Sequence, residues 1–261
     1  MNSSSKSLVQ SQFAANAENY ATSAIHAEGR SLARLIELTR PQTNWQALDI
    51  ATGAGHTAMA LAPHVAQVIA TDLTPQMLEV AAALAQKRGL ANITFREASA
   101  EELPFGDGTF DLVTCRIAPH HFDDVPAFVA EVKRVLKPRG TFGLVDNIAP
   151  DGVKAAEQLN ALEKVRDPSH VRCLSAGEWL QLLRKTGFIV RHSEILDKHM
   201  DLDGWAGRMS VNADIKPTLR EMLFDSTPGL QDYLRTKEGE SGNLKFNLQE
   251  AVFVATKMIR S

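Results

Sequence analysis

Cysteine is scarce in this sequence, with only two among 261 residues. Cys115 and Cys173 lie in unrelated contexts without the spacing of metal ligands, so we expect neither a disulfide framework nor a zinc site, and a reducing cytoplasm is favoured. Charge of one sign is not in excess either, since 28 basic and 31 acidic residues give a formal net charge of −3. This balance gives no reason to bind nucleic acid or a membrane surface, and it favours a small-molecule partner.

Long apolar runs are missing as well. No stretch approaches the roughly 18 apolar residues of a membrane span. Residues 1–11 are polar and serine-rich, without the apolar core of a signal peptide, and we expect the first ten to form a disordered tail. The composition, with 44% hydrophobic and 23% charged residues, is ordinary for a globular protein. The length suits one α/β domain with an embedded lid.

The stretch 47–58 organises the rest of the chain. Its apolar run Ala47–Ile50 precedes a glycine turn, and small and apolar residues follow, which predicts strand, tight loop and helix. Gly53 and Gly55 leave room for a ligand at the start of that helix. Asp72 follows roughly 20 residues after Gly53, where a carboxylate can bind both hydroxyls of a ribose.

Two classes of cofactor use this layout. Gly53, Gly55 and Ala58 satisfy the looser form of the dinucleotide fingerprint, so the spacing leaves NAD and an oxidoreductase open. Asp49 argues against NAD, because a dinucleotide-binding strand is normally apolar at that position. The alternative role for Asp49 is to hydrogen-bond the loop.

Strands and helices alternate along the chain. Together with the two strands around the glycine loop, apolar runs predict strands over 93–97, 109–115, 141–147, 188–196 and 250–257. Helices are predicted over 57–62, 74–89, 125–136, 153–165 and 175–186, and two more precede the first strand. This alternation indicates an α/β fold with a doubly wound, mainly parallel sheet of seven strands.

We expect four parts in the chain. They are a tail with N-terminal lid helices over 1–40, a core over 41–198, a helical lid insertion on the substrate side over 199–248 and a final strand within 249–261. In the first part, Gln12, Phe13 and Tyr20 would lie over the mouth of the cofactor site, although these helices could simply pack against the sheet.

Several stretches match a known family in order and spacing. They are Asp49–Gly55, Asp72, Met77, Ala100–Phe105, Phe110-Asp111 and Val135–Gly140. Together they resemble the class I S-adenosylmethionine (SAM)-dependent methyltransferases related to the ubiquinone and menaquinone biosynthesis enzymes. Cys115-Arg116, Pro119–Phe122 and Arg166–Arg172 resemble a bacterial subgroup of mostly unassigned substrate. The resemblance implies a Rossmann-like sheet whose last strand inserts antiparallel beside the fifth, with SAM as cofactor and S-adenosylhomocysteine as product.

The resemblance also implies roles at the cofactor. Asp49, Gly53 and Gly55 would hold the methionine end, Asp72 would bind the ribose, and Leu73 and Met77 would pack against the adenine. The other cofactor-binding residues that we expect are Tyr20, Ala51, Thr52, Ser99, Ala100, Glu101 and Arg116. Relatives often carry an aspartate in place of Ser99, so the hydrogen bond from the adenine amino group would lack charge assistance here.

The residues that carry the reaction are less defined. Methyl transfer from a sulfonium requires alignment and exclusion of water, and a base helps only if the acceptor must lose a proton. His121 and His120, after the fourth strand, are the candidate catalytic residues, with packing as their alternative role. His170 and Arg172, on a turn expected to be exposed, could anchor an anionic or phenolic acceptor. Adjacent histidines cannot face one metal ion, so no metal site is predicted.

The sequence thus favours methyl transfer from SAM to a small, partly apolar molecule such as a phenol or quinol. The acceptor would lie between loop 116–122 and the insertion, where Trp205, Met209, Met222 and Phe224 offer apolar side chains. An NAD-dependent oxidoreductase and a SAM-binding protein without turnover are the alternatives. The acceptor, the methylated atom, the use of a base and a homodimeric state stay open.

Overall fold

The computed structural model describes residues 6–14, 29–209, 211–239 and 242–258. Tyr20 and most of the first expected lid helix, over 11–28, lie outside these ranges, whereas the second helix expected before the sheet is described. Within them, no helix combines the length and the apolar character that crossing a bilayer requires.

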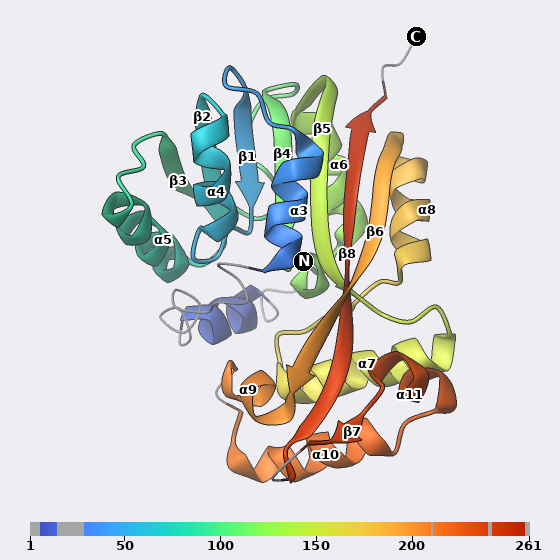
Figure 1. Cartoon of the computed structure of the whole chain (residues 1–261). Coiled ribbons are helices and arrows are strands. Elements are labelled where there is room, and N and C mark those ends of the chain that lie inside the picture. Colours follow the sequence, from blue (N-terminus) through green and yellow to red (C-terminus); the bar gives the residue numbers. More distant parts are fainter. Residues whose placement is uncertain (1–5, 15–28, 210, 240–241, 259–261) are drawn as a thin grey trace.

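One mixed sheet forms the centre of the molecule (Figure 1). Its strands follow the order β3 (Ile93–Glu97), β2 (Gln67–Asp72), β1 (Gln46–Ile50), β4 (Phe110–Arg116), β5 (Leu136–Ile148), β8 (Leu244–Lys257) and β6 (Phe188–Asp201). Neighbours from β3 to β5 are parallel, whereas β8 runs antiparallel between β5 and β6. This confirms the predicted doubly wound, seven-stranded order. The two-residue β7 (Lys237–Glu238) adds a short eighth strand beside β8.

Helices cover both faces of the sheet. The helices around the sheet are α3 (Arg30–Thr39), α4 (His56–Leu61), α5 (Pro75–Lys87), α6 (Val125–Val135) and α8 (Ala176–Thr186). Leu35 of α3 packs with Val145 and Val252 on one face, while Phe128 of α6 and Trp179 of α8 belong to the apolar cluster on the other. The predicted capping box of α8 is present, because Ser175 and Glu178 each accept from the other's backbone N–H.

The N-terminal segment differs from the expected tail. Residues 6–14 form a helix. Lys6 Nζ donates to Ser99 Oγ at 3.0 Å and pairs with Glu101 at 3.2 Å, and Gln10 Nε2 donates to the Leu73 carbonyl at 2.8 Å. The prediction of disorder was therefore wrong for residues 6–10, because these contacts hold the segment against the core.

Strands β6 and β8 run on beyond the rest of the sheet as a two-stranded arm (Figure 1). They stay paired from Phe188 and Lys257 to Asp201 and Lys245, so the insertion between them is shorter than the expected 199–248.

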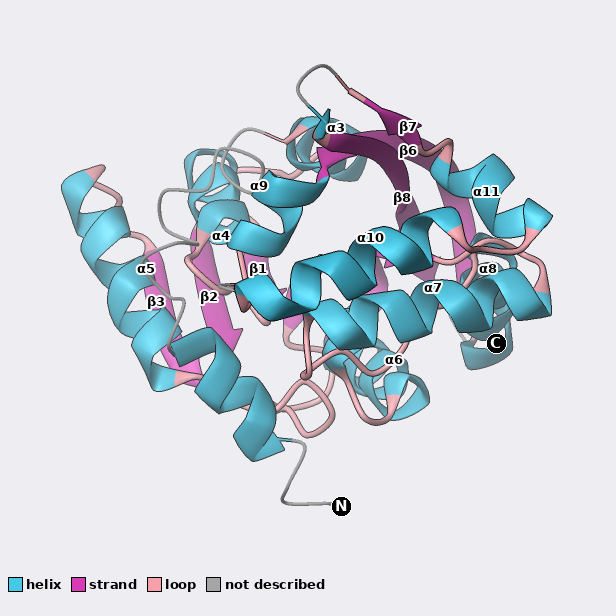
Figure 2. Ribbon diagram, turned by 90° about the horizontal axis from the view of Figure 1, so that it is seen from below, coloured by secondary structure: helices cyan, strands magenta, loops and turns pink. Residues whose placement is uncertain are grey.

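Four helices pack around the arm: α7 (Val153–Arg166), α9 (Leu202–Gly207), α10 (Lys216–Phe224) and α11 (Pro228–Leu234). Trp205, Leu219, Leu230 and Phe246 belong to the apolar cluster they share. Figure 2 shows α7 and α10 side by side below the sheet. The insertion is therefore helical, as expected, but it shares its core with α7 and the arm.

Candidate active site

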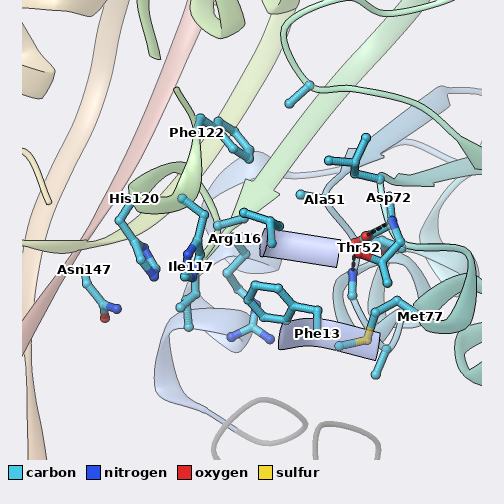
Figure 3. A pocket seen from close by; sticks show the side chains of 18 of the residues that line it. Phe13, Ala51, Thr52, Asp72, Met77, Arg116, Ile117, His120, Phe122 and Asn147 are labelled. Carbon is cyan, nitrogen blue, oxygen red and sulfur yellow. Dashed lines mark hydrogen bonds between the residues drawn. The ribbon is translucent and has the colours of Figure 1, made fainter. Parts of the chain in front are cut away.

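A pocket lies at the carboxyl ends of β1, β2 and β4 and extends to the arm (Figure 3). One part, which we call the glycine-loop half, is lined by residues of 49–57, 72–77 and 98–101. The other, which we call the basic half, is lined by loop 116–123 and by side chains of β5, α7, β6, α9 and β8, among them Arg166, Lys198 and Arg208. Lys6, Val9 and Phe13 of the N-terminal helix also line the pocket.

Asp49 is buried at the end of β1 and holds the glycine loop. Its Oδ2 accepts from the Thr52 hydroxyl at 2.6 Å, and its Oδ1 accepts from the Thr114 hydroxyl at 2.7 Å. Burial raises the pKa of this carboxyl to about 6. Asp49 therefore bonds the loop, as the alternative role required, and it also lines the pocket.

The two glycines of the loop have different structural roles. Gly53 has φ +53°, and a Cβ there would meet nothing within 4 Å, so its missing side chain leaves open space in the pocket. Gly55 has φ +82°, and a Cβ there would lie 2.9 Å from the Cβ of Ala81 in α5. Gly55 thus permits close packing of the loop on α5 and does not itself line the pocket.

Asp72 joins the glycine loop to the start of α5. Its Oδ2 accepts from the Gly53 N–H at 2.8 Å and its Oδ1 from the Thr74 N–H at 2.9 Å. Burial raises the pKa of the Asp72 carboxyl. Because a carboxylate oxygen accepts more than one hydrogen bond, both can still bind ligand hydroxyls. Leu73 and Met77 supply apolar lining. Figure 3 labels Asp72 and Met77 in the same part of the pocket.

The short helix η2 (Pro119–His121) places His120 against the end of β5. His120 Nδ1 lies 2.6 Å from Asp146 Oδ1, and both side chains are buried. In Figure 3 the His120 imidazole reaches into the space between Asn147 and Ile117. A carboxylate on Nδ1 favours the tautomer that carries its proton there, which leaves Nε2 as an acceptor.

His121 has a different environment. Its Nδ1 lies 3.2 Å from both Ser169 oxygens, and its ring meets Phe13 edge-on with centroids 5.0 Å apart. Burial, with a smaller effect of the neighbouring His120, lowers the pKa of His121 to about 3. His121 therefore stays neutral at physiological pH.

The turn 167–172 was predicted to be exposed and to anchor an acceptor. His170 is instead buried, with Nε2 at 2.8 Å from Asn160 Oδ1, and burial lowers its pKa to about 2. Arg172 pairs with Glu178 on the surface. Neither side chain lines the pocket, so this expectation was wrong. Backbone hydrogen bonds hold the turn against η2, because the Val171 and Arg172 N–H groups donate to the His120 carbonyl.

The pocket brings together most of the predicted site residues. Those that line it are Asp49, Ala51, Thr52, Gly53, Asp72, Leu73, Met77, Ser99, Ala100, Glu101, Arg116, His120 and His121. Trp205 also lines it, but the other three apolar side chains expected there do not. Met209 is buried elsewhere, Met222 packs in the cluster of the arm helices, and Phe224 is 41% exposed beneath Arg220.

Sequence reasoning missed several residues of the basic half. They are Asn147, Glu163, Arg166, Lys198, Met200, Arg208 and Leu248. Asp146, which holds His120, was missed as well; its position at the end of the predicted fifth strand was the one available signal. Among the described residues, no group of three His, Cys, Asp or Glu side chains is arranged to hold a metal ion.

Known proteins resemble this chain in sequence and in structure. The family described as "Methyltransferase domain" matches residues 48–144. The uncharacterized methyltransferase YcgJ of Bacillus subtilis is 40% identical over 205 residues, which cover 78% of this chain and 81% of YcgJ. Its crystal structure has a TM-score of 0.84 at 35% identity and covers 88% of this chain and 99% of that one.

Two further relatives extend the comparison. The uncharacterized protein YafE of Escherichia coli is 40% identical over 167 residues, which are 64% of this chain and 80% of YafE. The demethylmenaquinone methyltransferase of Thermus thermophilus is 38% identical over 109 residues, only 41% of this chain and 49% of that enzyme. These matches favour methyl transfer over the oxidoreductase alternative. Because the chain resembles YcgJ over most of both chains, it belongs to the class I SAM-dependent methyltransferases.

Proposed function

We propose that this protein transfers the methyl group of SAM to a hydroxyl group of a small, partly apolar molecule, with His120 as the general base. The proposal rests on the contact of 2.6 Å between Nδ1 of His120, which lines the pocket, and Oδ1 of the buried Asp146 behind it.

The glycine-loop half fits the cofactor. The open space at Gly53 and the two carboxylate oxygens of Asp72 suit a ligand with a ribose, and Leu73 and Met77 suit an adenine face. SAM, when bound, supplies an electrophilic methyl group. Asp72 would bind the ribose hydroxyls, and Asp49 would fix the loop at the methionine end through Thr52. The N-terminal helix would exclude water from this half.

His120 is better suited than His121 to remove a proton. Asp146 fixes the ring of His120 and stabilises the imidazolium that forms when Nε2 takes the acceptor's hydroxyl proton. His121 has a pKa near 3 and binds a proton poorly. A base is useful only where the acceptor carries a proton that must leave, so we propose an oxygen acceptor of the phenol or quinol kind. The apolar side chains of Trp205, Met200 and Leu248 would contact its body.

The test is a screen of hydroxyl compounds for S-adenosylhomocysteine formation, followed by two matched variants. His120→Gln should lower kcat by about 100-fold to 10,000-fold. Its affinity for S-adenosylhomocysteine should stay within twofold of the wild type. His121→Gln is the control and should retain most of the turnover. Full activity of His120→Gln on a confirmed acceptor would exclude His120 as the base.

A further inference from the structure

We infer that the basic half of the pocket binds an anionic group of the methyl acceptor, a carboxylate or a phosphate. This inference rests on the proposed function in one respect, namely that the basic half holds the acceptor. It adds a requirement that the apolar phenol or quinol expected from the sequence does not meet.

Three cationic side chains from separate elements reach the same part of the pocket. Arg166 is the last residue of α7, Lys198 lies in β6, and Arg208 directly follows α9. The side chains of Arg166 and Lys198 are only 12% and 13% exposed. Charges are seldom withdrawn from water to this extent without partners.

Carboxylates pair with two of these cations. Arg166 Nε lies 3.2 Å from Glu163 and its Nη2 4.0 Å from Asp167, and Lys198 Nζ lies 3.4 Å from Glu250. Of these acids only Glu163 lines the pocket. The ion pairs therefore fix Arg166 and Lys198 in place, and both side chains still line the pocket.

Arg166 and Lys198 keep donors for a ligand. A guanidinium has five N–H donors, and neither ion pair of Arg166 uses Nη1. Lys198 donates to Asn147 Oδ1 at 2.9 Å, and its ammonium has three donors. Arg208 Nη2 lies 3.4 Å from Sδ of Met200, which also lines the pocket.

The surroundings define the rest of the ligand. The Arg166 guanidinium lies 4.8 Å from the centroid of the Trp205 ring, and Met200 and Leu248 line the wall nearby. A flat apolar body can lie against these side chains while its anionic group meets the cations. Together with a hydroxyl near His120, this describes a hydroxyaryl acid or a hydroxyaryl phosphate. A neutral quinol would leave the three cations without a counter-charge from the ligand.

Calorimetry on the protein saturated with S-adenosylhomocysteine tests this directly. The probes are 4-hydroxybenzoate, 4-hydroxyphenyl phosphate and, as the neutral analogue of similar shape, methyl 4-hydroxybenzoate. We expect at least one anion to bind at least tenfold more tightly than the ester. The preferred anion distinguishes a carboxylate from a phosphate.

Two changes in the basic half should remove this preference. Arg208→Gln should weaken the anion by about 10-fold to 100-fold and leave the ester unchanged. The double variant Lys198→Met/Glu250→Gln should do the same, because it removes the ammonium without leaving Glu250 unpaired in the interior. Arg220→Gln, on the exposed side of α10, is the matched control and should keep the preference. Thermal unfolding of each variant shows that it is folded.

Equal binding of the ester and the anions would overturn the inference, as would binding of neither anion at millimolar concentration. An anion preference that survives both basic-half variants would overturn it as well. Because binding is measured without turnover, these results do not depend on finding an acceptor. If S-adenosylhomocysteine itself fails to bind, the proposed function fails, and the same titrations on the protein alone still decide whether the subsite exists.

Discussion

The carboxylate of Asp72 accepts the backbone N–H of Gly53 at 2.8 Å, so the acidic side chain after β2 fixes the glycine loop after β1. Asp72→Ala should therefore weaken SAM and S-adenosylhomocysteine by similar factors, because the two ligands share the ribose. The loss of charge-assisted hydrogen bonds should cost about 1.5 to 3 kcal/mol of binding free energy. Calorimetry measures both affinities, with Glu79→Gln on the exposed face of α5 as the control. Unchanged affinities would show that Asp72 does not bind the ribose.

The two loop glycines should respond differently to alanine. Both residues have positive φ, which costs an L-residue roughly 1–2 kcal/mol. Gly55→Ala also brings its Cβ against Ala81 and should lose more stability in urea unfolding than Gly53→Ala. Gly53→Ala should instead lose more affinity for S-adenosylhomocysteine, because its methyl group enters the pocket. The reverse order of the two effects would contradict the roles assigned to these glycines.

The N-terminal helix should become more protected when the cofactor is bound. Residues 6–14 contact the loop after β3, the loop before α5 and His121, so a ligand beneath them would add further contacts. Hydrogen exchange of this segment should slow when S-adenosylhomocysteine is added. Peptides from α8, which lies away from the pocket, serve as the internal control. Equal exchange with and without ligand would mean that the helix packs on the core and is no lid.

Buried His170 should make folding sensitive to acid. Its pKa is lowered to about 2, against about 6.5 in an unfolded chain, so between these values only the unfolded state binds the proton. Stability is thus lost as the pH falls. From pH 7.5 to 5.5 this histidine should account for about 1.4 kcal/mol of lost stability.

The comparison of variants isolates this effect. Asp49, whose pKa is raised to about 6, acts in the opposite direction over part of the same range, so the wild type alone is not informative. His170→Gln should lose less stability than the wild type on acidification, as measured by urea unfolding at the two pH values. His64→Gln, at an exposed site, should behave like the wild type. Identical pH dependence of all three proteins would rule out a buried neutral His170.

The sequence predicted the glycine-loop half far better than the basic half. Asp49, Gly53 and Asp72 lie within or just after two consecutive strands, and parallel strands bring their carboxyl ends to one edge of the sheet. The local sequence pattern of these two strands was therefore sufficient to predict that the three residues lie together.

The basic half depends on contacts between distant segments. Arg166, Lys198 and Arg208 meet only because β6 and β8 continue past the sheet and α7 packs against them. In the sequence the far ends of these strands read as polar and irregular, since one face of the arm is exposed to solvent. The buried state of His170 was missed for a related reason, because Asn160, its partner, lies on a separate helix.

The arm also sets how far its own pocket side chains lie from the glycine loop. β8 pairs with β5 only as far as Gln249, while its pairing with β6 continues to Lys245. The backbone hydrogen bonds between β6 and β8 therefore hold the arm side chains Lys198, Met200 and Leu248 in a fixed register. Side chains on a strand return to the same face every second residue, with a rise of about 6.6 Å. Lengthening both strands by two residues would move their own pocket side chains outward by that distance and keep the same strand face toward the pocket. On the inference that the basic half holds the acceptor, the length of acceptor that fits is thus adjustable in discrete steps, without any change in the glycine loop.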